Sequence, residues 1–256
     1  MIFPPGEYSI YIVGDQWVDD QDLIALSHGK TNRGNIKTGF SNFADTLCNA
    51  QSGPLADQQG HTADDLRNTY RQGEAQARQV SQKNSVKEIA YGTAYDSMAS
   101  LQHDLTNVAK EGNERIKEIQ DSKEPVAAKV PQIVAAIHQY RALANVVAAK
   151  YSGNVFDAMQ RILDTEGSGQ SARQFAQSHG VDVGNMFRQP DDEASLTQEV
   201  TGKLNGVPLP ALASGGGLPP GVQTPGEAPP PPHPVAPAAF GSGGGLPAGV
   251  QAGGGT

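Results

Sequence analysis

The chain has 256 residues, of which 37% are hydrophobic and 6% aromatic, and its formal net charge at pH 7 is −8. This composition limits the buried core to a thin one of small aliphatic side chains, and the negative charge disfavours nucleic acid and anionic membranes as primary partners. No stretch approaches the roughly 18 apolar residues of a membrane span. The single cysteine, Cys48, excludes an internal disulfide, and we expect it to be a small buried apolar side chain.

Residues 1–16 predict an irregular or briefly extended lead-in. Pro4-Pro5-Gly6 is a turn sequence, and alternate residues from Tyr8 to Ile12 are apolar. No Lys or Arg precedes this short apolar run, which argues against a Sec-type signal peptide. The only tryptophan of the chain, Trp17, follows the lead-in.

Helical spacing begins after Trp17. Asp19 and Asp20 predict an N-terminal cap, because short acidic side chains accept the free N–H groups of a first turn. The stretch 29–34 is rich in Gly, Asn and Thr and predicts an interruption, after which a second helix is expected from Asn35 to just before Gly53.

A third helix is expected to begin near Thr62, with a capping-box-like pairing between Thr62 and the turn that carries Asp65. Apolar residues at helical spacing then continue to Val80. Two alternatives stay open for this helix: it ends before residue 86, or it continues into the long hairpin that follows.

The strongest pattern is a long helical hairpin over residues 86–164. Apolar residues recur every three or four positions in two arms, about 86–122 and 126–164. Pro125 separates the arms, because the residue before a proline is pushed out of the helical region. Pro131 falls in or close to the first turn of the second arm, where its missing N–H costs little. Arms of roughly 50 to 60 Å predict a rod with two apolar stripes that need partners.

After the hairpin, the break at Gly167-Ser168-Gly169 is followed by a predicted short helix over 171–178, with Phe175 as its anchor and Gly180 as its stop. Residues 181–187 are expected to pack back on the bundle. Residues 206–256 are dominated by Pro and Gly and predict a disordered tail, because they cannot bury enough apolar surface to offset the ordering entropy.

The expected organisation therefore has three parts. Residues 1–165 form an all-α, elongated antiparallel helical bundle built on the long hairpin. Residues 166–205 form a short helix and a connecting segment. Residues 206–256 form the disordered Pro/Gly-rich tail.

No motif indicates catalysis, a cofactor or a metal. The glycine pattern of residues 167–172 resembles a dinucleotide fingerprint, but a predicted helix precedes it where that fingerprint needs a strand. No histidine lies three or four residues from another histidine, no Glu-x-x-His pair occurs, and His138 is expected at the boundary of the apolar stripe. We therefore expect a non-enzymatic protein without catalytic, cofactor-binding or metal-binding residues.

Trp17-Val18-Asp19-Asp20, followed by a helical lead-in, a long Ala-rich hairpin and a Pro/Gly-rich tail, resembles the secretion-associated proteins of the mycobacterial type VII (ESX) systems. The likeness covers about residues 16–164 and the style of the tail. The Trp-x-Gly turn typical of many such hairpins is absent, because Val18-Asp19 follows Trp17.

The export pattern Tyr-x-x-x-Asp/Glu of that family occurs twice, from Tyr11 to Asp15 and from Tyr70 to Glu74. The resemblance makes Trp17, Tyr70 and Glu74 candidate export or recognition residues. For Trp17 we expect packing against the hairpin to be the main role.

The resemblance implies a secreted or cell-envelope helical protein that leaves the cytoplasm by a non-Sec route. Its expected partners are proteins, namely the secretion machinery and a chaperone or helical partner chain. Two alternatives stay open. One is the N-terminal delivery module of a larger secreted effector or toxin, since the sequence ends inside a linker-like Gly-rich stretch. The other is a cytoplasmic helical adaptor or phage structural protein.

Overall fold

A computed structural model describes residues 4–184 and 193–206, which belong to one compact unit, Met1–Gly217. Every regular element of these residues is a helix, which confirms the all-α class. The predicted tail lies outside the described residues apart from Gly206. The elements are α1 (Ser9–Val13), the 3-10 helix η1 (Gly14–Gln16), α2 (Asp20–Ser52), α3 (His61–Asp121), α4 (Val126–Glu166), α5 (Ala172–Ser178) and α6 (Glu193–Leu204).

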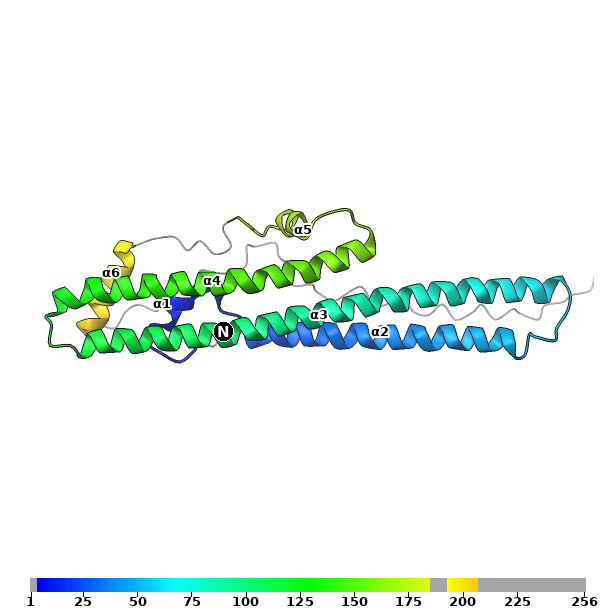
Figure 1. Ribbon diagram of the computed structural model, residues 1–256, viewed down its shortest axis with the longest axis horizontal. Helices are drawn as coiled ribbons and strands as arrows, with labels where there is room; N and C mark the ends of the chain where they lie inside the picture. Colours follow the sequence, from blue (N-terminus) through cyan, green and yellow to red (C-terminus); the bar gives the residue numbers. More distant parts are fainter. Residues whose placement is uncertain (1–3, 185–192, 207–256) are drawn as a thin grey trace, which may run out of the picture. The chain divides into compact units, whose positions relative to one another are not determined.

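The central element of this unit is α3, and both α2 and α4 pack antiparallel against it (Figure 1). Its 61 residues span about 90 Å at about 1.5 Å per residue. The start of α2 lies beside Gln102 and the end of α4 lies beside Lys83, so both helices flank α3 only between these positions. The result is the expected elongated antiparallel bundle built on a long hairpin, here α3 and α4.

The predicted interruption at residues 29–34 is wrong, because α2 runs unbroken through it. The two glycines lie against α3: a Cβ atom on Gly29 would be 2.6 Å from Cε1 of Tyr91, and one on Gly34 would be 3.0 Å from Oε1 of Glu88. Their helix propensity is lower than that of alanine by about 1 kcal/mol each, but their size lets the two helices approach closely.

The helix predicted from Thr62 is continuous with the first arm of the hairpin, as one of the two alternatives held. The predicted Thr62 cap is wrong. Gly60 is the N-cap, with a φ of 105° and no side-chain hydrogen bond, and Thr62 already lies inside the first turn of α3.

The hairpin turn lies where the sequence placed it. Pro125 is the N-cap of α4, which begins at Val126. Pro131 lies farther inside the helix than expected, in its second turn. Its ring removes the helical N–H partner of the Ala127 carbonyl, but Ala127 and Pro131 are both exposed, so water can satisfy that carbonyl.

The expected irregular or extended lead-in is instead the short helix α1, which is deeply buried. Ile12 and Val13 are fully buried, and Tyr8 is 1% exposed. Asn113 of α3 holds this helix: its Oδ1 accepts the N–H of Tyr8 at 2.8 Å, and its Nδ2 donates to Oγ of Ser9 at 3.0 Å. A five-residue helix is not stable alone, so these contacts with α3 decide its conformation.

The core differs between the two halves of α3. Large side chains are fully buried where α3 packs against α1 and α4 and where α6 lies on α4, whereas the seam between α2 and α3 is lined by alanines. The fully buried large residues are Tyr8, Ile12, Val13, Leu105, Ile116, Ile133, Ile137 and Val200. The buried alanines of the other half include Ala44, Ala63 and Ala77.

The short helix over 171–178 forms as predicted, with Ser171 and Gln174 as a capping box and Gly180 in a left-handed conformation after it. Its predicted anchor, Phe175, is only half-buried and lies against His179, with ring centroids 4.2 Å apart. Ala172 and Ala176 are the buried residues.

Helix α6 was not predicted. It lies on α4 with Leu196 and Val200 buried. The segment 181–187, expected to pack back on the bundle, is described only as far as Gly184, and Val181 is 39% exposed.

Candidate functional site

Trp17 lies in the short extended link between η1 and α2. Its side chain is partly buried against the core, while its neighbour Val18 is only 7% exposed. Nε2 of Gln102 donates to the carbonyl oxygen of Val18 at 3.2 Å and to Oδ1 of Asp20 at 2.8 Å. Asp19 is the N-cap of α2, with a capping box to Asp22, as its position in the sequence predicted. The link is therefore fixed on the C-terminal side of Trp17.

Trp17 lines a cleft of about 470 Å³ at the place where the start of α2 lies beside α3 and α4. Its walls are mainly apolar and come from three separate stretches of the chain. They include Trp17, Val18, Leu26, Met98, Leu101 and Ala148. Of these residues, the sequence made only Trp17 a candidate site residue. No local sequence pattern shows that the three stretches meet.

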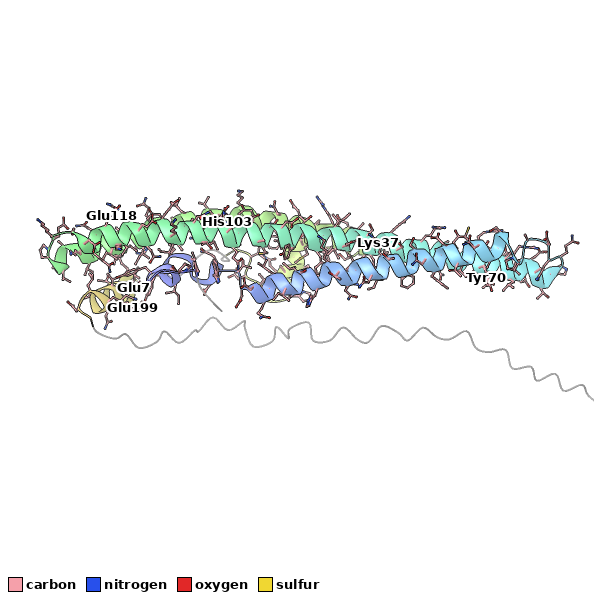
Figure 2. The ribbon with its side chains drawn as sticks, turned by 90° about the horizontal axis from the view of Figure 1, so that it is seen from below. Glu7, Lys37, Tyr70, His103, Glu118 and Glu199 are labelled. Atoms are coloured by element: carbon pink, nitrogen blue, oxygen red, sulfur yellow. The ribbon has the colours of Figure 1, made fainter. Side chains whose placement is uncertain are left out.

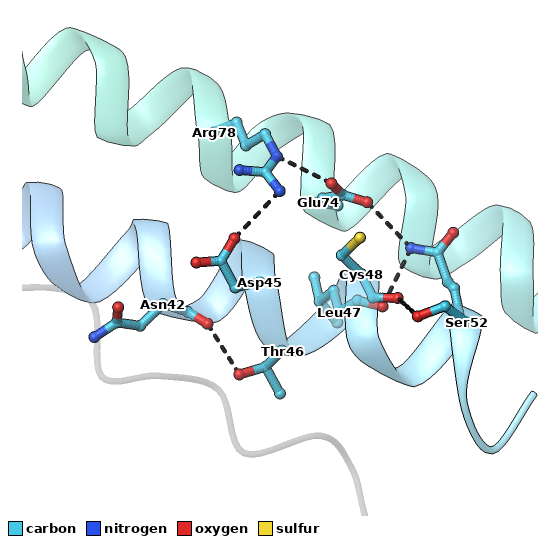
Figure 3. A network of polar contacts seen from close by, with 9 residues as sticks. Asn42, Asp45, Thr46, Leu47, Cys48, Ser52, Glu74 and Arg78 are labelled. Carbon is cyan, nitrogen blue, oxygen red and sulfur yellow. Dashed lines mark hydrogen bonds and ion pairs between the residues drawn. The ribbon is translucent and has the colours of Figure 1, made fainter.

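Tyr70 and Glu74 lie one turn apart on α3, beside the C-terminal end of α2. Both are half-buried, and the carboxylate of Glu74 accepts hydrogen bonds from Nε of Arg78 at 2.9 Å and from Nε2 of Gln51 at 3.3 Å. Arg78 also pairs with Asp45 of α2 at 3.3 Å, so this network joins the two helices (Figure 3). Glu74 thus has a structural role whether or not a receptor recognises it.

The structure does not bring the three candidate export residues together. Trp17 precedes the first residue of α2, whereas Glu74 contacts Gln51 in the last turn of α2. The 33 residues between these ends span about 50 Å. Figure 2 shows Tyr70 near the loop that joins α2 to α3. A single compact receptor surface would therefore contact one end or the other.

The other occurrence of the export pattern, from Tyr11 to Asp15, lies at the N-terminal end of the chain and is largely buried. Tyr11 belongs to α1 and is 9% exposed, while Asp15 is exposed in η1. Nζ of Lys203, on α6, lies 5.2 Å from the ring centroid of Tyr8 and 5.8 Å from that of Tyr11, and pairs with Glu7 at 3.2 Å. Tyr11 therefore contributes to the attachment of α6, and its burial disfavours recognition by a partner.

Burial raises the pKa of Tyr8 to about 12, with a further contribution from Glu7, and burial together with Glu199 raises the pKa of Tyr11 to about 12. Figure 2 labels these two acidic residues, Glu7 and Glu199, near α1 and α6. In the unfolded chain a tyrosine ionises near pH 10. Between about pH 10 and 12, Tyr8 and Tyr11 therefore keep their phenol protons in the folded state but lose them in the unfolded state.

The free energy of unfolding should therefore fall between about pH 10 and 12, by at most about 1.4 kcal/mol per pH unit for each tyrosine. Urea unfolding at a series of pH values would measure this slope. Tyr11→Phe should make the slope shallower, because its phenol no longer titrates. An equal slope in the wild type and the variant would contradict the assignment.

No group of three or more His, Cys, Asp or Glu side chains in residues 4–184 and 193–206 is arranged to hold a metal ion. Cys48 is half-buried and not the buried residue that we expected. The glycine pattern at 167–172 has a structural explanation: Gly167 ends α4 in a left-handed conformation, and Ser171 caps α5.

No protein-family model matches the chain, and no solved structure matches it. Over 212 residues, 82% of the chain, the sequence is 33% identical to a protein of Mycobacterium tuberculosis (strain ATCC 25618 / H37Rv) with the name uncharacterized protein Rv2082. The match covers 29% of that relative, so the chain spans less than a third of its length. This similarity is to a mycobacterial protein whose name states no activity.

Within the described part of the chain, none of the helices is both long enough and apolar enough to span a membrane.

Proposed function

We propose that the helical unit is a non-enzymatic interaction module of a type VII (ESX) secretion substrate or secretion-associated protein. The observation that carries the proposal is an apolar stripe on α2, formed by Ile36, Phe40, Phe43 and Leu47. Phe40 is 39% exposed and Phe43 is 52% exposed, while Ile36 and Leu47 are half-buried. Their spacing of four, three and four residues places them on one face of the helix.

The stripe needs a partner because α2 is poorly buried by the described part of the chain. Ala44 is the only fully buried residue among the 33 of α2, and the helix packs mainly against α3. A partner helix laid along α2 and α3 would cover the stripe through contacts of the coiled-coil kind. In this proposal the protein acts in the cell envelope or outside the cell, after a cytoplasmic stage, and Tyr70 and Glu74 are the candidate export residues.

Export is tested by expressing a tagged copy in a mycobacterial host with and without a functional ESX membrane ATPase. Culture filtrate, envelope and cytosol are then blotted. We expect the protein outside the cytosol only when the ATPase works. Retention in the cytosol of both strains would favour an intracellular helical adaptor, whose partner could be sought with Phe43→Asp as the negative control.

Trp17→Ala should lower the free energy of unfolding by about 1 to 3 kcal/mol, because a half-buried aromatic side chain loses its contacts with the core. Circular dichroism during urea unfolding would measure the change, and Trp17→Phe, which keeps most of the packing, should lose less. An unchanged stability together with lost export would instead make Trp17 a recognition residue.

A second candidate function is the delivery module of a larger secreted effector or toxin. The comparison with the Mycobacterium tuberculosis relative favours this function, because the matching region is only 29% of that longer protein. A reporter domain fused after Thr256 should then be exported in an ATPase-dependent way. Export of the unfused chain combined with retention of every fusion would argue against delivery.

A further inference from the structure

The cleft beside Trp17 is separate from the apolar stripe on α2. It is bounded by η1 and the link to α2, by the first two turns of α2, and by Met98 and Leu101 of α3 with Ala148 of α4. Its volume of about 470 Å³ falls in the range of pockets that hold small organic molecules, about 300 to 1,000 Å³. The walls offer apolar contact to most of such a ligand.

The polar groups of the cleft favour one charge. Among the described residues, Asp15 and Asp22 line it and no Lys, Arg or His does. Residues 15–22 contain four aspartates and no basic residue, a local charge that favours a cationic ligand. Only one carboxylate oxygen of Asp22 is involved in the cap of α2, where it accepts the N–H of Asp19. The other oxygen remains available as an acceptor.

Gln16 provides a second, independent observation. Its side chain lines the cleft and the residue is 8% exposed, yet its Oε1 accepts no hydrogen bond from any described residue. Its Nε2 donates to Oδ1 of Asn145 on α4, which fixes the amide. A buried acceptor without a donor costs about 1 to 3 kcal/mol. Oε1 has almost no solvent-accessible surface, so a bound N–H or O–H group would satisfy it only after the amide turned toward the cleft.

We propose that this cleft binds a compact organic amine in its protonated form. The apolar body would lie against Leu26, Met98 and Leu101. The ammonium group would lie toward Asp15 and Asp22, where the indole face of Trp17 adds a cation–π attraction. This site does not depend on the export proposal, because it uses neither the stripe on α2 nor Tyr70 and Glu74.

Trp17 is the only tryptophan, so its fluorescence reports on the cleft directly. The full chain is titrated with 2-phenylethylamine, 2-phenylethanol and phenylacetate, which share a ring and differ in charge. We expect a saturable change with the amine, with a Kd on the order of 1 mM or tighter for so small a probe. The alcohol should bind roughly tenfold more weakly, and the acid should not saturate up to about 20 mM.

Two variants test the location. Ala25→Phe, at an exposed position on the cleft wall, should abolish the change, whereas Ala142→Phe, exposed on α4 and away from the cleft, should leave it intact. Asp15→Asn should weaken the amine severalfold and bring its affinity close to that of the alcohol.

Several outcomes would overturn the proposal. They are no saturable change with the amine, equal affinities for amine and acid, and an unaltered response of Ala25→Phe. Binding of an amine-bearing peptide without binding of 2-phenylethylamine would also overturn it, because the cleft would then belong to a protein interface.

Discussion

Replacing Gly112 with valine is expected to lower the free energy of unfolding by about 2 to 3 kcal/mol, although glycine is normally the weaker helix former. A Cβ atom at this position would lie 2.5 Å from Cδ1 of Ile12 and 3.1 Å from Cγ of Tyr140. Ile12 is fully buried, so it cannot move away into solvent. The added side chain must displace α1 or open the packing between α3 and α4.

Urea unfolding followed by circular dichroism would measure this effect, with Gly153→Val as the matched control. Gly153 lies inside α4, and apart from its chain neighbours and the local helix backbone no described atom lies within 4 Å of the position that its Cβ would take. Its substitution should leave stability unchanged or raise it slightly. Equal effects at the two glycines would contradict the packing argument.

A double-mutant cycle would attribute the loss to Ile12. Ile12→Ala removes the clashing atom, so the combined loss with Gly112→Val should be smaller than the sum of the single losses by about 1 kcal/mol or more. Additive losses would mean that valine acts through some other contact of α3.

The second large effect is expected for Ile137→Ala, which should lower the free energy of unfolding by about 2 to 5 kcal/mol. Ile137 of α4 is fully buried among the large side chains of the core. Truncation to alanine leaves a cavity, because the surrounding side chains cannot move in to fill it completely. Leu143→Ala on the same helix should cost less than about 0.5 kcal/mol, because Leu143 is 45% exposed.

The same difference in packing predicts how the bundle opens. The half of α3 that contacts α2 buries alanines, so its amides should exchange with solvent faster than those around Ile137 and Leu105. Uniform protection along all 61 residues of α3 would contradict this difference.

Of the candidate site, the sequence identified single residues but not the surfaces they form. Trp17 was expected to pack on the hairpin, and it lies partly buried against the core. The cleft beside it depends on which turns of α3 and α4 lie opposite η1, and this register has no local pattern in the sequence. The roles of Tyr70 and Glu74 in export stay predictions, while the bonds of Glu74 to Arg78 and Gln51 were not foreseen.

By itself the sequence determined the all-α class, the long hairpin, the turn at Pro125 and the Asp19 cap. Each of these depends on residues close together in the chain: apolar spacing sets the helical faces, and prolines and short acidic side chains set the ends. Only the tertiary structure decided that 29–34 stays helical, that the lead-in folds as α1, and that α6 forms on α4. In each case a distant contact outweighs weak local propensity: Tyr91 against Gly29, Asn113 against Tyr8 and Ser9, and the burial of Leu196 and Val200.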